Sequence, residues 1–186
     1  MTMRIRRLMG IALAMLVIAA PTAAAVPVPV DIELALFVNI WKLDRTFDAA
    51  HITLAIVYQE NYPDSVNVKD DLIEAVAKLK LPIICIPINA PTALDLHDRL
   101  SVTPANVVYI APLRAVDVGT VAEVTRRRGL RSITGMPEYV DAGVAVGIGV
   151  RKNRPLIIVN LGGARAEGSS FSSQLLELAR IVGPHS

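Results

Sequence analysis

Three short apolar runs, each followed by a segment of helical character, constrain the fold of this chain more than any other feature. The runs HITLAIVY (51–58), IICIPI (83–88) and NVVYIA (106–111) are rich in β-branched residues and are bounded by polar or proline-containing stretches. Such runs are typical of buried strands. Strands that alternate with helices favour a parallel sheet, because each parallel connection needs a crossover segment.

The segments around these runs carry helix signals. The segment 31–43 has acidic residues in its first turn and apolar residues on most sides, as expected of a largely buried helix. Three more helices are predicted from cap residues and from the Pro or Gly that ends them. They are one capped by Asn67 and ended before Pro82, one from Thr92 to Leu100, and one from Arg114 to Arg128, ended by Gly129.

The C-terminal third of the chain changes character. A short strand is predicted at 130–133, and the strand-like runs 144–150 and 156–160 are separated by RKNRP, which is typical of a hairpin turn. A final helix is predicted from about Ser172 to Ile181, with Ser170 or Ser172 available as its cap. The pattern as a whole predicts one Rossmann-like α/β domain of three layers, whose mainly parallel sheet ends in an antiparallel C-terminal hairpin.

The N-terminus has the pattern of a secretory signal peptide. Arg4, Arg6 and Arg7 precede an uncharged apolar run at 8–20, and small residues at 23–25 suit signal peptidase, so we expect cleavage before Val26. An uncleaved anchor is the alternative, but the apolar run is shorter than the roughly 20 residues that a membrane helix needs. The predicted organisation is a signal peptide at 1–25, an extended leader at 26–30 and the α/β domain at 31–183.

Removal of the signal peptide would change the charge of the protein. The whole chain has 19 basic and 17 acidic residues, and loss of three arginines leaves 16 and 17, a net charge of −1. Nucleic-acid binding needs clustered cations. The mature domain is therefore not expected to bind nucleic acid.

No motif in the sequence calls for catalysis, a metal or another cofactor. His51, His97 and His185 are isolated from one another and from Cys85, and the chain has no G-x-S-x-G nucleophile elbow. Cys85 is the only cysteine, so no intrachain disulfide can form. A buried, inert thiol is the expected interpretation, with an intermolecular bridge or a redox sensor as the alternatives.

Two groups of glycines invite a phosphate-binding interpretation. Gly143, Gly147 and Gly149 match neither the dinucleotide fingerprint nor the P-loop, and are expected to relieve crowding within a strand. Gly162 and Gly163 follow a predicted strand. They could place backbone amides near a phosphate, but a plain strand-to-helix turn is favoured.

Two segments resemble the YfiR/HmsC-like family of bacterial periplasmic regulators. NRPLIIVNLGGARAEGSSFSSQLLELARIV, near the C-terminus, resembles the closing signature of that family, and ALFVNIWKL resembles its early helix. The resemblance extends with weak identity through the middle of the chain. The matching positions are Asn39, Lys42, Asn160, Leu161, Ala164, Arg165, Gly168, Ser172, Ser173, Leu175 and Leu176.

The resemblance implies a non-catalytic periplasmic protein that represses a membrane-bound diguanylate cyclase. Such repressors hold the periplasmic sensor region of the cyclase and lower cyclic di-GMP and biofilm output. Dimers are characteristic of the best-known members, so the resemblance also implies a possible homodimer. Known members also carry paired cysteines that support redox sensing, whereas Cys85 has no partner in this chain. The Trp-Pro pair expected after the early helix is missing as well, since the chain reads LDRTFD there.

Two other classes of function stay open on the sequence alone. A periplasmic small-molecule binding protein is the first alternative, because parallel α/β sheets form ligand crevices at the carboxyl ends of their strands. An enzyme is the second, and it would require a polar cleft with convergent ionisable groups.

Overall fold

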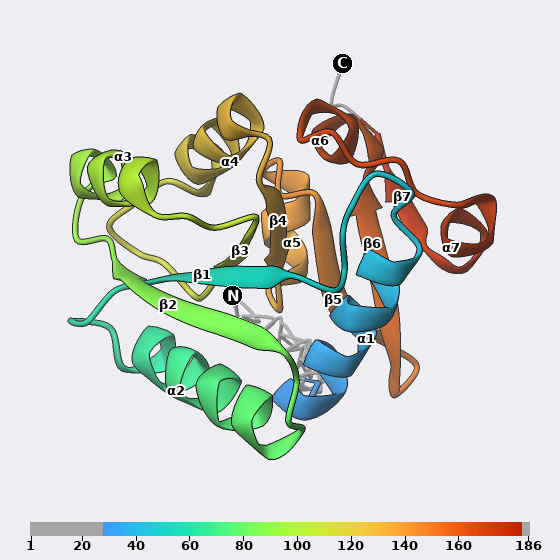
Figure 1. Cartoon of the computed structure of the whole chain (residues 1–186), viewed down its shortest axis with the longest axis horizontal. Coiled ribbons are helices and arrows are strands. Elements are labelled where there is room, and N and C mark those ends of the chain that lie inside the picture. The colour runs from blue at the N-terminus through green and yellow to red at the C-terminus, as the bar shows by residue number, and fades with distance from the viewer. Residues whose placement is uncertain (1–27, 184–186) are drawn as a thin grey trace, which may run out of the picture.

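Seven strands form one sheet in the order β2-β1-β3-β4-β5-β6-β7 (Figure 1). The computed structural model describes residues 28–183, so the signal peptide, its cleavage site and the first part of the leader lie outside the described residues. The strands are β1 (Ile52–Tyr58), β2 (Ile83–Asn89), β3 (Val107–Ile110), β4 (Arg131–Thr134), β5 (Val146–Arg151), β6 (Arg154–Asn160) and β7 (Arg180–Val182). The helices are α1 (Val30–Lys42), α2 (Pro63–Lys78), α3 (Ala93–Val102), α4 (Val118–Arg128), α5 (Pro137–Asp141), α6 (Leu161–Ala166) and α7 (Ser173–Leu178).

The pairing of the strands confirms the predicted fold class. Strands β1 to β5 are parallel to their neighbours, β5 and β6 form an antiparallel hairpin, and β7 is parallel to β6. The chain moves outward from β1 to β2, then returns to β3 on the other side of β1 and continues away from it. The order of the strands therefore reverses between β1 and β3, which is the point where ligands bind in doubly wound sheets.

Two apolar clusters, one on each face of the sheet, hold the three layers together. Leu54 and Ile56 of β1 belong to the cluster that contains the buried residues of α1 and α2. Ala55 and Val57 belong to the cluster that contains those of α3 and α4. This alternation follows from the two-residue period of a strand. Each large apolar side chain that is fully buried contributes about 1.5–3 kcal/mol to folding.

Helix α5 packs against Gly147 and Gly149 of β5. This agrees with the prediction that these glycines relieve crowding within a strand. A Cβ atom added to Gly147 would lie 2.5 Å from Val140 Cγ2, and one added to Gly149 would lie 3.0 Å from Pro137 Cγ. The hairpin turn after β5 is also confirmed, since Lys152 and Asn153 both have positive φ angles of 50° and 61°, as a two-residue hairpin turn requires.

Three predicted helix boundaries are wrong. Helix α2 begins at Pro63 rather than near Asn67, because a proline in the first turn has its φ already set for a helix. Helix α4 begins at Val118, where Asp117 caps it, rather than at Arg114. The last helix ends at Leu178, and residues 180–182 form β7 instead, because they add a strand to the free edge of β6.

Two short helices span only five and six residues, α5 and α6. The sequence predicts no helix at α5, and at α6 it predicts only the turn from a strand into a helix at Gly162 and Gly163. The caps at Thr92, Gly129 and Ser172 are as predicted. At α6, the Asn160 side chain accepts a hydrogen bond from the N–H of Gly163. The strand-to-helix turn interpretation of Gly162 and Gly163 is thereby confirmed.

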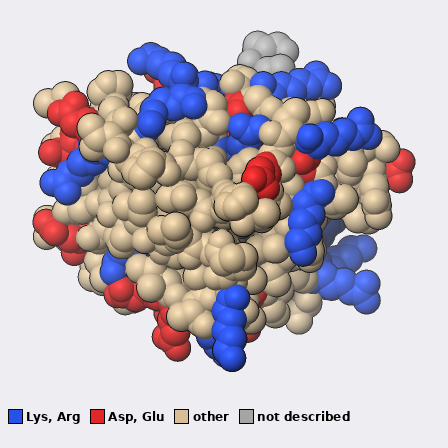
Figure 2. Space-filling model, viewed as in Figure 1, with Lys and Arg blue, Asp and Glu red and all other residues tan. Residues whose placement is uncertain are grey.

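Strand β2 is one edge of the sheet, and its surface is uncharged. Figure 2 shows no charged side chain over the position of β2, and Ile84 is 64% exposed. The N–H of Ala90 donates to Tyr58 on β1, so the alternation of the backbone turns Pro87 toward the open side. A proline there has no N–H to offer and guards the edge against another strand.

Cys85 lies at the same edge. It is half-buried rather than buried as expected, and burial raises the pKa of its thiol.

Candidate functional site

A small pocket lies at the reversal point of the sheet, beyond the carboxyl ends of β1 and β3. Its volume is about 150 Å³. Its lining consists of residues 59–62 after β1, Asn89 at the end of β2, Pro91 after β2, and Arg114 and Ala115 after β3. The position agrees with the ligand crevice expected of a parallel α/β sheet.

Gln59, which follows β1, connects the loops after β2 and β3 at this pocket. Its side chain is buried, its Oε1 accepts hydrogen bonds from the N–H groups of Arg114 (2.7 Å) and Ala115 (3.2 Å), and its Nε2 donates to the Ala90 carbonyl (3.2 Å). All three partners are backbone groups, so the amide fixes the shape of the pocket rather than its chemistry. The polar groups left at the mouth include the Arg114 guanidinium, 4.0 Å from the centre of the Tyr62 ring, and the exposed carboxylate of Glu60.

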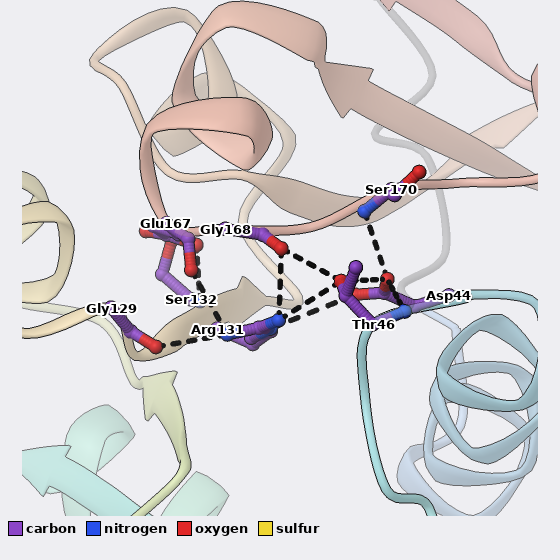
Figure 3. A network of polar contacts seen from close by, with 8 residues as sticks. All are labelled: Asp44, Thr46, Gly129, Arg131, Ser132, Glu167, Gly168 and Ser170. Carbon is purple, nitrogen blue, oxygen red and sulfur yellow. Dashed lines mark hydrogen bonds and ion pairs between the residues drawn. The ribbon is translucent and has the colours of Figure 1, made fainter.

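A cluster of polar side chains lies at the start of β4 (Figure 3). In it, Arg131 joins the loop after α1 to the segment after α6. The Arg131 guanidinium donates to the carbonyls of Glu167 (2.9 Å) and Gly168 (3.0 Å) and to the Thr46 hydroxyl (3.2 Å). The Asp44 carboxylate accepts from the N–H of Ser170 at 2.9 Å and lies 3.6 Å from Arg131 Nε. Three segments far apart in the chain therefore meet at one arginine: residues 44–46, 129–131 and 167–170.

Asp44 is fixed in its charged form by this cluster. Burial alone would raise the pKa of Asp44, but hydrogen bonds from Ser170 and from the backbone and hydroxyl of Thr46 outweigh it and leave the pKa below its usual value. The ionised Asp44 attracts the Arg131 guanidinium across 3.6 Å, as an ion pair without a hydrogen bond. The cluster is therefore a structural clamp on the C-terminal segment.

Glu167 adds a buried carboxylate next to the clamp, on the α4 side of the sheet. It is 0% exposed and accepts from the Ser132 N–H (2.8 Å), the Ser132 hydroxyl and the Thr125 hydroxyl (2.7 Å). Burial, countered in part by the hydrogen bonds from Ser132 and Thr125, raises the pKa of Glu167 to about 7. The carboxylate ties α4, β4 and α6 together.

Glu33 is a third buried carboxylate, on the opposite face of the sheet. It belongs to the first turn of α1, is 4% exposed, and accepts a hydrogen bond of 3.0 Å from the Tyr109 hydroxyl. Burial, countered in part by that hydrogen bond, raises the pKa of Glu33 to about 7. Burial and the charge of Glu33 also raise the pKa of Tyr109.

These ionisable groups do not converge on one cleft. Glu33 and Glu167 lie on opposite faces of the sheet, and the His51–Asp48 pair (2.8 Å) is on the surface. Within residues 28–183, no three His, Cys, Asp or Glu side chains lie together as metal ligands. No helix of that range is long and apolar enough to cross a bilayer.

The positions of the family resemblance serve mainly as structure. Asn160 caps α6 and also donates from Nδ2 to the Val140 carbonyl (3.1 Å), and Ser172 caps α7. Gly168 has a φ of +87°, a backbone conformation that favours glycine, and its carbonyl belongs to the clamp. Ala164 and Leu175 are buried, Leu161 and Leu176 are half-buried, and Asn39, Lys42, Arg165 and Ser173 are exposed.

The sequence did not predict the residues that organise the pocket and the clamp. No local pattern singles out Gln59, Arg131 or Glu167. For Glu33, the sequence indicates a place in the first turn of a helix but not that the side chain is buried. Its burial depends on Tyr109, which is 76 residues away in the chain.

Comparison with known proteins gives one sequence match. The sequence profile of a protein family described as YfiR/HmsC-like matches residues 44–180. That range begins at Asp44 and ends at Arg180, and so contains the clamp and most of the sheet. Among curated proteins, none matches the sequence.

Three solved structures share the fold. A conserved domain protein from Vibrio cholerae O1 biovar eltor is 15% identical with a TM-score of 0.59, over 82% of this chain and 60% of that one. The ABC domain from Streptococcus pneumoniae, in complex with L-Trp, is 10% identical with a TM-score of 0.64, over 83% and 62%. A substrate binding protein with adhesive properties from Clostridium difficile is 17% identical with a TM-score of 0.61, over 85% and 61%.

The chain thus spans about three fifths of each of these structures. At such low identities the likeness shows the fold alone.

Proposed function

This chain belongs to the YfiR/HmsC-like family, and from that membership we propose that it represses a membrane-bound diguanylate cyclase by binding the periplasmic sensor region of that enzyme. The family is one of periplasmic, non-catalytic regulators that act through contacts with a sensor protein. The observation that carries the proposal is the family match over residues 44–180. The absence of converging catalytic groups within the described residues is compatible with a binding role.

The repressor function can be tested in the organism that carries the gene. Deletion should raise cellular cyclic di-GMP, measured by mass spectrometry, because the cyclase loses its inhibitor. Complementation with the full chain should restore the low level. Complementation with a version that starts at Val26, and so lacks the predicted signal peptide, should not restore it, because the protein would stay on the wrong side of the membrane.

Two results would overturn the proposal. One is an unchanged cyclic di-GMP level after deletion, together with no membrane protein crosslinked to the exported chain. The other is full restoration by the version without residues 1–25, which would mean that the protein acts in the cytoplasm.

The pocket at the reversal point of the sheet favours a second function, the binding of a small molecule. With a volume of about 150 Å³, this pocket suits a small ligand or one arm of a larger one. Its lining has one exposed cation, Arg114, and one exposed anion, Glu60. The ligand group that we propose is a carboxylate bound by Arg114. Thermal-shift measurements with a series of small carboxylates test this function. A shift that Arg114→Gln abolishes and Arg99→Gln, on α3, leaves unchanged supports it, and no shift with any carboxylate counts against it.

A further inference from the structure

The β5–β6 hairpin and β7 extend the sheet beyond its longer helices and leave a groove on the side of α5. The groove has a volume of about 500 Å³. Its lining includes Gly149, Leu156 and Ile158 of the sheet, Pro137 of α5, and Arg151 and Arg180 at the ends of their strands. We call this surface the hairpin groove. Helix α5 spans only five residues, so it covers one side of the groove and leaves the other open.

The strand register explains why the floor is apolar and the rim is basic. Gly149 pairs with Leu156, Arg151 pairs with Arg154, and Ile158 pairs with Arg180. Residues directly opposite on neighbouring strands share a face of the sheet. A Cβ atom on Gly149 would lie 3.2 Å from Ile158 Cδ1, so the glycine keeps the floor low.

The rim of the groove is basic. Residues 142–166 contain arginines and a lysine but no Asp or Glu. Helix α5 carries Glu138 and Asp141, but within residues 28–183 neither forms an ion pair with an arginine of the rim. Arg151 faces Arg154 directly, and like charges in that position destabilise a sheet. Neither of them, nor Arg180, forms an ion pair with another residue in the range 28–183. In Figure 2 basic side chains stand out at the lower right, where Figure 1 draws the tip of the hairpin.

We propose that the hairpin groove binds an extended acidic segment of a partner protein, with an apolar side chain over Leu156 and acidic side chains against Arg151 and Arg180. Charge complementarity identifies the partner as anionic, and binding would offset the repulsion between Arg151 and Arg154. A concave apolar floor between two cations fits alternate side chains of an extended peptide. The flat surface of an anionic membrane would reach the rim but not the floor.

This inference deepens the proposed function by assigning its contact surface, and it rests on that function only for the existence of a protein partner. If the repressor docked elsewhere, gene deletion would still raise cyclic di-GMP while the experiment below failed. The two failures are therefore distinguishable.

The experiment is fluorescence anisotropy with the purified protein and three labelled hexapeptides. One is acidic with an apolar centre (Glu-Asp-Leu-Phe-Asp-Glu), one is acidic without it (Glu-Asp-Ser-Ser-Asp-Glu), and one is basic (Lys-Lys-Leu-Phe-Lys-Lys). The test variant is Arg151→Gln/Arg180→Gln. The matched control is Lys78→Gln/Arg99→Gln, which removes the same charge from exposed positions on α2 and α3.

The first peptide should bind most tightly, and the test variant should weaken it by about five- to tenfold, as expected for two exposed charge contacts. The control variant should bind as the wild type does. Equal binding of the first peptide to both variants would overturn the proposal, as would equal binding of the acidic and basic peptides. Sedimentation with phosphatidylglycerol vesicles, without binding of any peptide, would assign the groove to anionic lipid instead.

Discussion

Replacement of Glu33 by Gln should remove the contribution of this carboxyl group to the pH dependence of the free energy of unfolding. The Glu33 carboxyl is 4% exposed, and among the described residues it meets no cation and accepts one hydrogen bond, from the Tyr109 hydroxyl. Its pKa in the folded protein is about 7, against an ordinary value of 4.5. The amide oxygen of a glutamine can accept the same hydrogen bond without a charge.

The sign follows from proton binding. Between about pH 4.5 and 7 the folded state holds a proton on Glu33 that the unfolded state has lost, so the stabilisation that this group gives is complete below pH 4.5 and is lost as the pH rises through 7. A difference of about 2.5 units corresponds to about 3 kcal/mol. Between pH 5 and pH 8 the wild type should therefore lose up to about 3 kcal/mol more stability than Glu33→Gln.

Urea unfolding at pH 5, 6, 7 and 8, followed by tryptophan fluorescence, measures this difference. Trp41 is the only tryptophan and is 2% exposed on α1, the helix that carries Glu33. Glu167 also has a raised pKa, so the comparison uses the difference between the two proteins rather than either curve alone. Glu74→Gln on α2 controls for the change of side chain at an exposed site. Parallel curves for the wild type and Glu33→Gln would refute the reasoning.

Three further predictions concern the clamp, the α5 contact and the guarded edge. Glu167→Ala should destabilise the protein by about 2–5 kcal/mol in urea unfolding, because it leaves the N–H and the hydroxyl of Ser132 without an acceptor, whereas the Thr125 hydroxyl keeps the Ala122 carbonyl; a loss below 1 kcal/mol would contradict this account. Gly147→Ala should cost about 1–3 kcal/mol because its Cβ would overlap Val140, whereas Gly162→Ala, with nothing closer than 3.6 Å to its Cβ, should be better tolerated in thermal unfolding. Pro87→Val should increase self-association in analytical ultracentrifugation, because it restores an outward N–H to an uncharged edge strand; an unchanged sedimentation coefficient at high concentration would argue against the guard.

Local pattern was enough for the elements that the structure confirms. The runs at 51–58, 83–88 and 106–111 became β1, β2 and β3 within one residue at most of their ends, because a buried strand needs apolar side chains on both faces. The turn between β5 and β6 was equally local, since it depends on residues that are adjacent in the chain. Short helices such as α5 and α6 carry too few residues to show a period.

The candidate site could be predicted only in part. That a crevice would lie at the carboxyl ends of the strands follows from the α/β class, and Arg114 and Gln59 stand in the loops that form it. Nothing local shows that Gln59 would bind the backbone 55 residues ahead of it. The hairpin groove likewise depends on which strands are neighbours, because its two rim arginines are 29 residues apart in the chain.

By itself, the sequence determined that this chain forms an α/β domain with an antiparallel hairpin, and it carried the family signature. Periodicity encodes burial one element at a time, and caps and turns are set by a few adjacent residues. Only the tertiary structure decided that residues 180–182 form a strand, that Glu33 and Glu167 are buried, and that Arg131 joins three segments. Those outcomes depend on partners distant in sequence, since a strand exists only where a neighbouring edge is free and a charge is buried only where donors converge on it.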